Sequence, residues 1–455
     1  MADATESLNS PSLPSQGDRE LDLCLTIVRG LQGRWSRQPG RFPTMIAGRI
    51  LSDEVAAAIG EFGVSWQQRQ HGLAEALNSK DRDSLVRTAF GNAFPESDDD
   101  APVNVAAAQL CSSVREALGR DVESFAVPRT FHFGCWLVRD QPLHFDLGAI
   151  RFLPRDHWLD DLERSGRIDA VIARRVRRAW SGSPPRKRPL NNSETRERAI
   201  LDTIGACPDV CTVTIENMAA AVGEEKALLS ARLGLTVISL LWRRPSAAME
   251  GFGLLIDGGG SRGWFMGTRP NKDLVSSYGR ATRIPGTTWT TDKLEENWRD
   301  IDWFRLPAGK ALSAFASGHL PHRRDAIDRA IFLAFWWMHE AMEARTALMA
   351  TAKFGAVLDT LAGGRGKDHH IANMLSQRLG ISKEGPVTQS GRTLKKIVAE
   401  VYGRARSTTL HGLNDQFGSD WTDIRDLAEK LARDALVATL GWVHDNAADR
   451  LPDYA

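Results

Sequence analysis

The segment IDRAIFLAFWWMHEAM, residues 327–342, decides the fold of the C-terminal third of the chain. Its large apolar side chains recur every three or four residues, as they do along one face of an α-helix. They are Ile327, Ile331, Phe335, Met338 and Met342. A helix with such a stripe buries it against other helices, so the segment predicts one member of a helical bundle.

The segments that follow continue the helical pattern, and no strand is predicted after residue 323. Further helices are predicted at residues 346–361, 368–379, 390–402 and 421–444. The sequence Gly363-Gly364-Arg365-Gly366 breaks the chain before the third of the five helices. Five helices of this size with short links predict an all-α bundle over residues 321–455.

Toward the N-terminus the period of the apolar residues changes. Segments 130–138 and 143–152 are rich in aromatic and β-branched residues, and they predict two strands turned at residues 139–142. Helices are predicted from residue 156, at 194–204 and at 224–241, and a hairpin at 252–266. We therefore expect an α+β protein, with a disordered tail (1–20), a helical region (21–120), an α+β region (121–320) and the bundle.

Composition limits the classes of function. The 455 residues include 58 Lys and Arg against 57 Asp and Glu, so a general attraction to nucleic acid is absent and an RNA site must be a local patch. Five scattered cysteines do not form a disulfide framework, which fits a reducing cytosol. The longest apolar runs, 233–242 and 330–338, are shorter than the roughly 20 residues that span a bilayer. These observations predict a soluble cytoplasmic protein without a membrane partner.

Near the C-terminus, the segment YGRARSTTLHG (residues 402–412) places Arg406 and His411 close together without an acidic residue. A guanidinium beside an imidazole that titrates near neutrality can cleave RNA without a metal. The imidazole moves the proton and the guanidinium stabilises the charged phosphorane. Similar spacing occurs at Arg139/His144, Arg151/His157 and Arg365/His370, so spacing alone does not select the site.

The sequence around this pair resembles the RS…HG signature of HEPN domains, in particular the Apea-like group. The match consists of Arg406-Ser407, three residues, and His411-Gly412, with Tyr402 upstream. Segment 357–361 is similar to the apolar-acidic-apolar helix end of that family, with Asp359 where glutamate is usual. Segment 374–378 is similar to its arginine-bearing helix. The resemblance covers about residues 323–445.

The resemblance implies an all-helical domain that dimerises, so that two Arg/His motifs share one RNA-cutting site without metal or cofactor. His411 would be the acid/base, Arg406 the phosphate stabiliser and Ser407 a polar helper. Arg404 remains an alternative to Arg406. In a regular helix Arg404 lies on the face of His411, and Arg406 lies about 140° away from it. Such proteins often serve as toxins or antiphage abortive-infection effectors.

Two alternatives stay open beside this endoribonuclease hypothesis. The bundle could be a non-catalytic module that dimerises or binds a nucleotide or a protein partner. The basic segment 174–188 could bind a phosphate backbone, either that of RNA or that of duplex DNA in transcriptional regulation, although a solvated linker is the simpler interpretation. The trigger or partner of residues 21–320 is not indicated by the sequence.

A second basic patch supports an RNA substrate. Arg392, Lys395 and Lys396 lie one helix before the Arg/His segment and would attract the phosphate backbone. By contrast, the glycines of segment 258–263 have dinucleotide-site spacing, but no helix start follows them. That segment predicts a hairpin turn.

Overall fold

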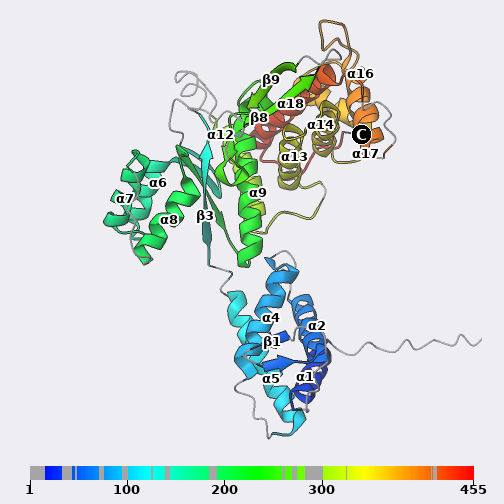
Figure 1. Cartoon of the computed structure of the whole chain (residues 1–455). Helices are drawn as coiled ribbons and strands as arrows, with labels where there is room; N and C mark the ends of the chain where they lie inside the picture. The colour runs from blue at the N-terminus through cyan, green and yellow to red at the C-terminus, as the bar shows by residue number, and fades with distance from the viewer. Residues whose placement is uncertain are drawn as a thin grey trace, which may run out of the picture. The chain divides into compact units, whose positions relative to one another are not determined.

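The computed structural model is mainly helical, with one five-stranded sheet and two two-stranded ribbons (Figure 1). It describes residues 16–32, 44–46, 49–70, 76–94, 101–123, 125, 127–138, 144–183, 192–258, 262–268, 274–281, 301–323, 325–410, 412 and 418–454. The predicted α+β class with a helical C-terminal region is confirmed. The chain forms two compact units, residues 1–128 with 216–225, and residues 129–215 with 226–455.

Within the described residues, the first unit contains four main helices and a short ribbon. The helices are α1 (Gln16–Gln32), α2 (Asp53–Arg69), α4 (Ser79–Ala93) and α5 (Val103–Glu123), and the ribbon pairs β1 (Thr44–Ile46) with β2 (Arg49–Leu51). The side chains of Ser52 and Asn78 cap the N-termini of α2 and α4. Between the helices, the fully buried carboxylate of Glu20 accepts hydrogen bonds from Arg69 and Arg115.

The sheet of the second unit has the strand order β4-β5-β6-β3-β7, and every neighbouring pair is antiparallel. Its strands are β3 (Arg129–Trp136), β4 (Phe145–Leu147), β5 (Ile150–Pro154), β6 (Asp209–Ile215) and β7 (Gly253–Leu254). Helices α6 (Arg155–Arg164), α7 (Ala170–Trp180) and α8 (Asn192–Ile204) connect β5 to β6. The apolar side chains of these helices form a core with Leu153, Cys207 and Val210.

Two strand predictions need correction. Segment 143–152 is not one strand: it holds β4 and the start of β5, which pair with each other. It does not form a hairpin with the strand at 130–138, because β6 lies between β3 and β5. Nearly every residue of strand β6 is buried, as expected of a central strand. The predicted hairpin at 252–266 is also wrong. β7 pairs with β3, whereas β8 (Arg262–Thr268) pairs with the later strand β9 (Leu274–Ala281). The turn at 139–142 lies outside the described residues.

The surroundings of His132 on β3 lead us to expect that the folded protein loses stability in acid. The indole Nε1 of Trp158 donates to Nδ1 of His132 at 3.1 Å. Burial, and secondarily the charge of Arg167, lowers the pKa of His132 from 6.5 to about 4. The unfolded chain therefore binds this proton more tightly, so the neutral imidazole stabilises the folded state above pH 6.5. That stability, about 3 kcal/mol, is lost as the pH falls toward 4.

Urea unfolding at neutral pH and near pH 4 measures this contribution. Between the two conditions, the free energy of unfolding of the wild type is expected to fall by about 3 kcal/mol more than that of His132→Gln. The glutamine can still accept from Trp158 but does not titrate. Equal losses in the two proteins would show that His132 has the same pKa folded and unfolded.

The C-terminal region of the described chain consists of helices. They are α12 (Asp302–Ala316), α13 (Ile327–Met342), α14 (Ala347–Leu361), α15 (Asp368–Leu379), α16 (Leu394–Val398), the π-helix η4 (Ala399–Ser407), α17 (Thr408–Leu410) and α18 (Thr422–Asn446). Fifteen-residue α14 packs against α13, α18 and η4, and most of its side chains are buried. Gly148 and Gly309, whose backbones nearly touch, let α12 approach the β4–β5 turn. Among the helices that the structure describes, none has the length and apolar character to cross a membrane.

Candidate RNA-cleavage site

The Arg/His segment lies on an unusual piece of backbone. Residues 399–407 form the nine-residue π-helix η4, which continues α16 and leads into α17. π-Helical backbone is rare and occurs mostly as short insertions, frequently at functional sites. The sequence predicted instead an ordinary helix at 390–402. The α-helical angle that separated Arg404 from Arg406 by face therefore does not apply to this segment, since the two arginines lie on wider turns.

Arg406 points toward the C-terminal end of α14, where two side chains hold it. Its Nη1 donates to the Tyr402 hydroxyl at 2.9 Å, and its Nη2 lies 3.3 Å from Oδ2 of Asp359. The guanidinium carbon lies 4.9 Å from the centre of the Tyr402 ring. Asp359 is in turn fixed by the backbone N–H of Gly366, which donates to Oδ1 at 3.1 Å. The guanidinium is thus oriented from two sides.

Burial shifts the pKa of two groups in this cluster. It raises the pKa of Asp359, against the opposing effects of the Gly366 N–H and the Arg406 charge. Burial, followed by the negative charge of Asp359, also raises the pKa of Tyr402. Tyr402 is therefore a neutral phenol near pH 7 and positions the arginine without acting as a base. In the described part of the chain, the buried Nε of Arg406 lacks a hydrogen-bond partner.

A glycine on the neighbouring helix sets the distance between α14 and η4. A Cβ atom at Gly355 would lie 3.1 Å from the carbonyl oxygen of Val401 and 3.2 Å from Cβ of Arg406. Contacts this short require the neighbouring backbone to move. Gly355 therefore allows the close approach that brings Arg406 to Asp359.

The remaining predicted residues of the segment have other surroundings. Arg404 is exposed, and its guanidinium carbon lies 5.7 Å from the centre of the Trp421 ring. Ser407 is partly buried at the end of η4. His411 lies outside the described residues. The structure thus brings Arg406 together with Tyr402 and Asp359, and it gives Arg404 a different aromatic neighbour.

The predicted RNA-binding patch is partly neutralised by carboxylates. Arg392 lies 3.7 Å from Glu400, and Lys395 lies 3.4 Å from Glu384. Lys396 is exposed on α16. Three cations against these two acids leave one net positive charge. Arg392 is eight residues from Glu400, and Lys395 is eleven residues from Glu384, so these pairs do not have the three- or four-residue spacing of ion pairs within one helix.

Sequence reasoning missed the role of Asp359 as the partner of Arg406. It singled out Asp359 only as a helix-end residue, and a separation of 47 residues in sequence carries no contact signal. Arg378, on the predicted arginine-bearing helix, stacks on Trp442 at 3.8 Å and belongs to a different contact. His370 is 4% exposed, and a positive charge on its imidazole would lower the pKa of Asp359.

Comparison with protein families, with curated proteins and with solved structures finds no match to this chain.

Proposed function

We propose that the C-terminal bundle is a metal-independent endoribonuclease of the HEPN type, with His411 and Arg406 as its catalytic residues. The observation that carries the proposal is the orientation of Arg406 by Asp359 and Tyr402. A guanidinium that is already held in one orientation can bind a phosphate without a further loss of side-chain entropy. Preorganised sites stabilise a transition state in this way. The resemblance of the surrounding segment to the RS…HG signature adds independent support.

The proposed reaction is an attack of the ribose 2′-oxygen on the adjacent phosphorus. His411 removes the 2′-hydroxyl proton as the new P–O bond forms. Arg406 stabilises the additional negative charge on the phosphorane. The bond to the 5′-oxygen then breaks, and this oxygen takes up a proton. The products are a 2′,3′-cyclic phosphate and a 5′-hydroxyl, so atoms and charge balance without water or metal.

The proposal includes a homodimer and a cytoplasmic location. In a homodimer the His411 of each protomer would serve the shared site, one as base and the other as acid toward the leaving oxygen. Ser407 and Arg404 would assist with polar contacts to RNA, and Arg392, Lys395 and Lys396 would attract its backbone. A toxin or antiphage effector that cuts cellular RNA is the biological role that fits this chemistry.

Purified full-length protein tests the proposal directly. In EDTA, the wild type is expected to cut a labelled single-stranded RNA and to leave 2′,3′-cyclic phosphate ends. Expression of the wild type is expected to arrest bacterial growth. Intact RNA in EDTA, combined with normal growth on expression, would reject the nuclease proposal.

The second candidate function is a non-catalytic dimerisation or binding module. The ion pair with Asp359 favours it, because a carboxylate 3.3 Å away offsets part of the charge that Arg406 would offer to a phosphate. In that case Arg406 would stabilise the packing of η4 on α14. Its replacement would then lower the melting temperature, and wild type and variant alike would leave RNA uncut.

A further inference from the structure

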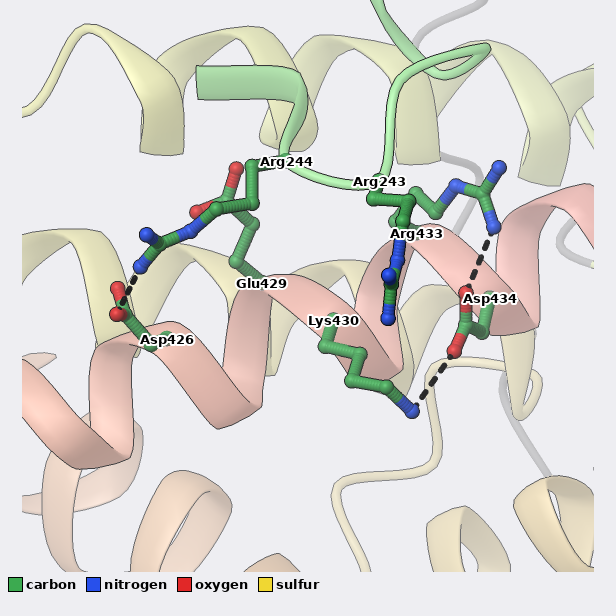
Figure 2. A pocket seen from close by; sticks show the side chains of 7 residues that line it. All are labelled: Arg243, Arg244, Asp426, Glu429, Lys430, Arg433 and Asp434. Carbon is green, nitrogen blue, oxygen red and sulfur yellow. Dashed lines mark hydrogen bonds and ion pairs between the residues drawn. The ribbon is translucent and has the colours of Figure 1, made fainter. Parts of the chain in front are cut away.

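A hollow of about 440 Å³ lies between the turn that precedes α10 (Pro245–Met249) and the first half of α18. Every residue that lines it carries a charge. They are Arg243, Arg244, Asp426, Glu429, Lys430, Arg433 and Asp434. Figure 2 shows the two arginines of the turn facing the charged side chains of α18 across this space.

The aspartates of the hollow already have cationic partners. Asp426 pairs with Arg244 and lies 2.9 Å from Arg425, which adjoins the hollow. Asp434 lies 3.3 Å from Lys430 and 2.9 Å from Arg433. Each aspartate therefore holds two cations in place. A ligand that brought a further cation would compete with these pairs.

Buried contacts fix the two sides of the hollow. Glu429 is 2% exposed and accepts from the backbone N–H and the hydroxyl of Ser246, at 2.7 and 2.9 Å. These bonds anchor the start of α10 and with it the turn that carries Arg243. From the other side, Nε of Arg433 donates to the carbonyl oxygen of Leu240 at 2.9 Å. These hydrogen bonds therefore fix the backbone turn that carries Arg243 and the side chain of Arg433.

The charge balance of the hollow favours an anion. Its lining has four cations against three carboxylates. Arg243 is exposed and makes no hydrogen bond or ion pair within the described part of the chain. Guanidinium groups present planar sets of N–H donors that match phosphate oxygens. Among the described residues, no apolar or aromatic side chain lines the space, so it offers a nucleobase no aromatic ring to stack on.

We propose that this hollow binds the phosphate groups of a ligand, with Arg243, Lys430 and Arg433 contacting the phosphate oxygens. The three carboxylates orient the cations and do not touch the ligand. The phosphates come from a small polyphosphate-bearing molecule or from the backbone of RNA, which share the same recognition chemistry. The proposal stands whether or not the bundle cleaves RNA.

Titration calorimetry on the full-length protein at low salt tests the site, with pyrophosphate and a short RNA oligonucleotide as probes. His411→Ala is used for the oligonucleotide, so that cleavage does not interfere. Arg243→Gln is expected to weaken binding about tenfold or more, since one charge-assisted hydrogen-bonding group is lost. The exposed Arg345, on the α13–α14 turn, supplies the matched control Arg345→Gln, which should bind as the wild type does.

The two probes separate the sources of the phosphate. Tight binding of pyrophosphate indicates a small ligand, and preferential binding of the oligonucleotide indicates an RNA backbone; either outcome requires the loss in Arg243→Gln. The proposal is overturned if neither probe binds the wild type. It is equally overturned if Arg243→Gln binds both probes with wild-type affinity, or if Arg345→Gln weakens binding as much as Arg243→Gln does.

Discussion

Replacing His411 by alanine is expected to slow RNA cleavage by about 10²- to 10⁴-fold, the range that a general acid–base residue contributes. The imidazole is the group in the 402–412 segment that can take and return a proton near neutral pH. Without it, the 2′-hydroxyl must be activated by solvent. The measurement is the single-turnover rate of the full-length protein in EDTA on one labelled RNA, together with growth after expression.

His444→Ala is the matched control for this substitution. His444 is exposed near the C-terminal end of α18, so its loss should leave both the rate and the growth arrest unchanged. Cleavage by His411→Ala at the wild-type rate would remove this histidine from the mechanism. A loss of the same size in both variants would point to a general effect on folding.

Arg406→Ala is expected to lower the cleavage rate by about 10²- to 10³-fold, as losing a preorganised donor does at other charge-stabilising sites. Arg404→Ala is expected to keep the rate within about threefold of the wild type, because Arg404 is exposed and packs over Trp421. Arg406→Lys should be nearly as slow as the alanine variant. A lysine cannot reproduce the planar fork that reaches Tyr402 and Asp359 together.

Melting temperatures recorded beside the rates keep this comparison free of folding effects. A slow Arg406→Ala enzyme that melts near the wild type has lost a catalytic group. If Arg404→Ala is the slow variant and Arg406→Ala is not, the phosphate-stabilising role passes to Arg404. If both keep the wild-type rate, neither arginine stabilises the transition state.

The helices of the bundle follow closely from sequence. Residues 327–342 and 368–379 are helical over the predicted ranges, and 346–361 differs by a residue at its start. The spacing of apolar side chains is a local property of the sequence, so it predicts a helix without knowledge of the tertiary fold. The π-helix at 399–407 could not be predicted in this way. It forms where η4 packs closely on Gly355, a contact between positions far apart in the chain.

The strand order could not be predicted from the sequence, for a similar reason. Segments 130–138 and 143–152 are neighbours along the chain, and a hairpin is the simplest pairing for neighbours. β6 lies between β3 and β5 and is buried at nearly every residue, as central strands are. Pairing partners are chosen by total burial across the sheet, which no local pattern contains.

Sequence by itself determined the helical C-terminal region, the α+β class and a candidate Arg/His pair, because residue type and spacing act locally. Only the tertiary structure decided that Arg406 meets Asp359 and Tyr402, and that Arg243 and Arg244 face α18 across a charged hollow. Ion pairs and hollows depend on which distant segments pack together. That choice is made by the burial of whole faces, after local structure has formed.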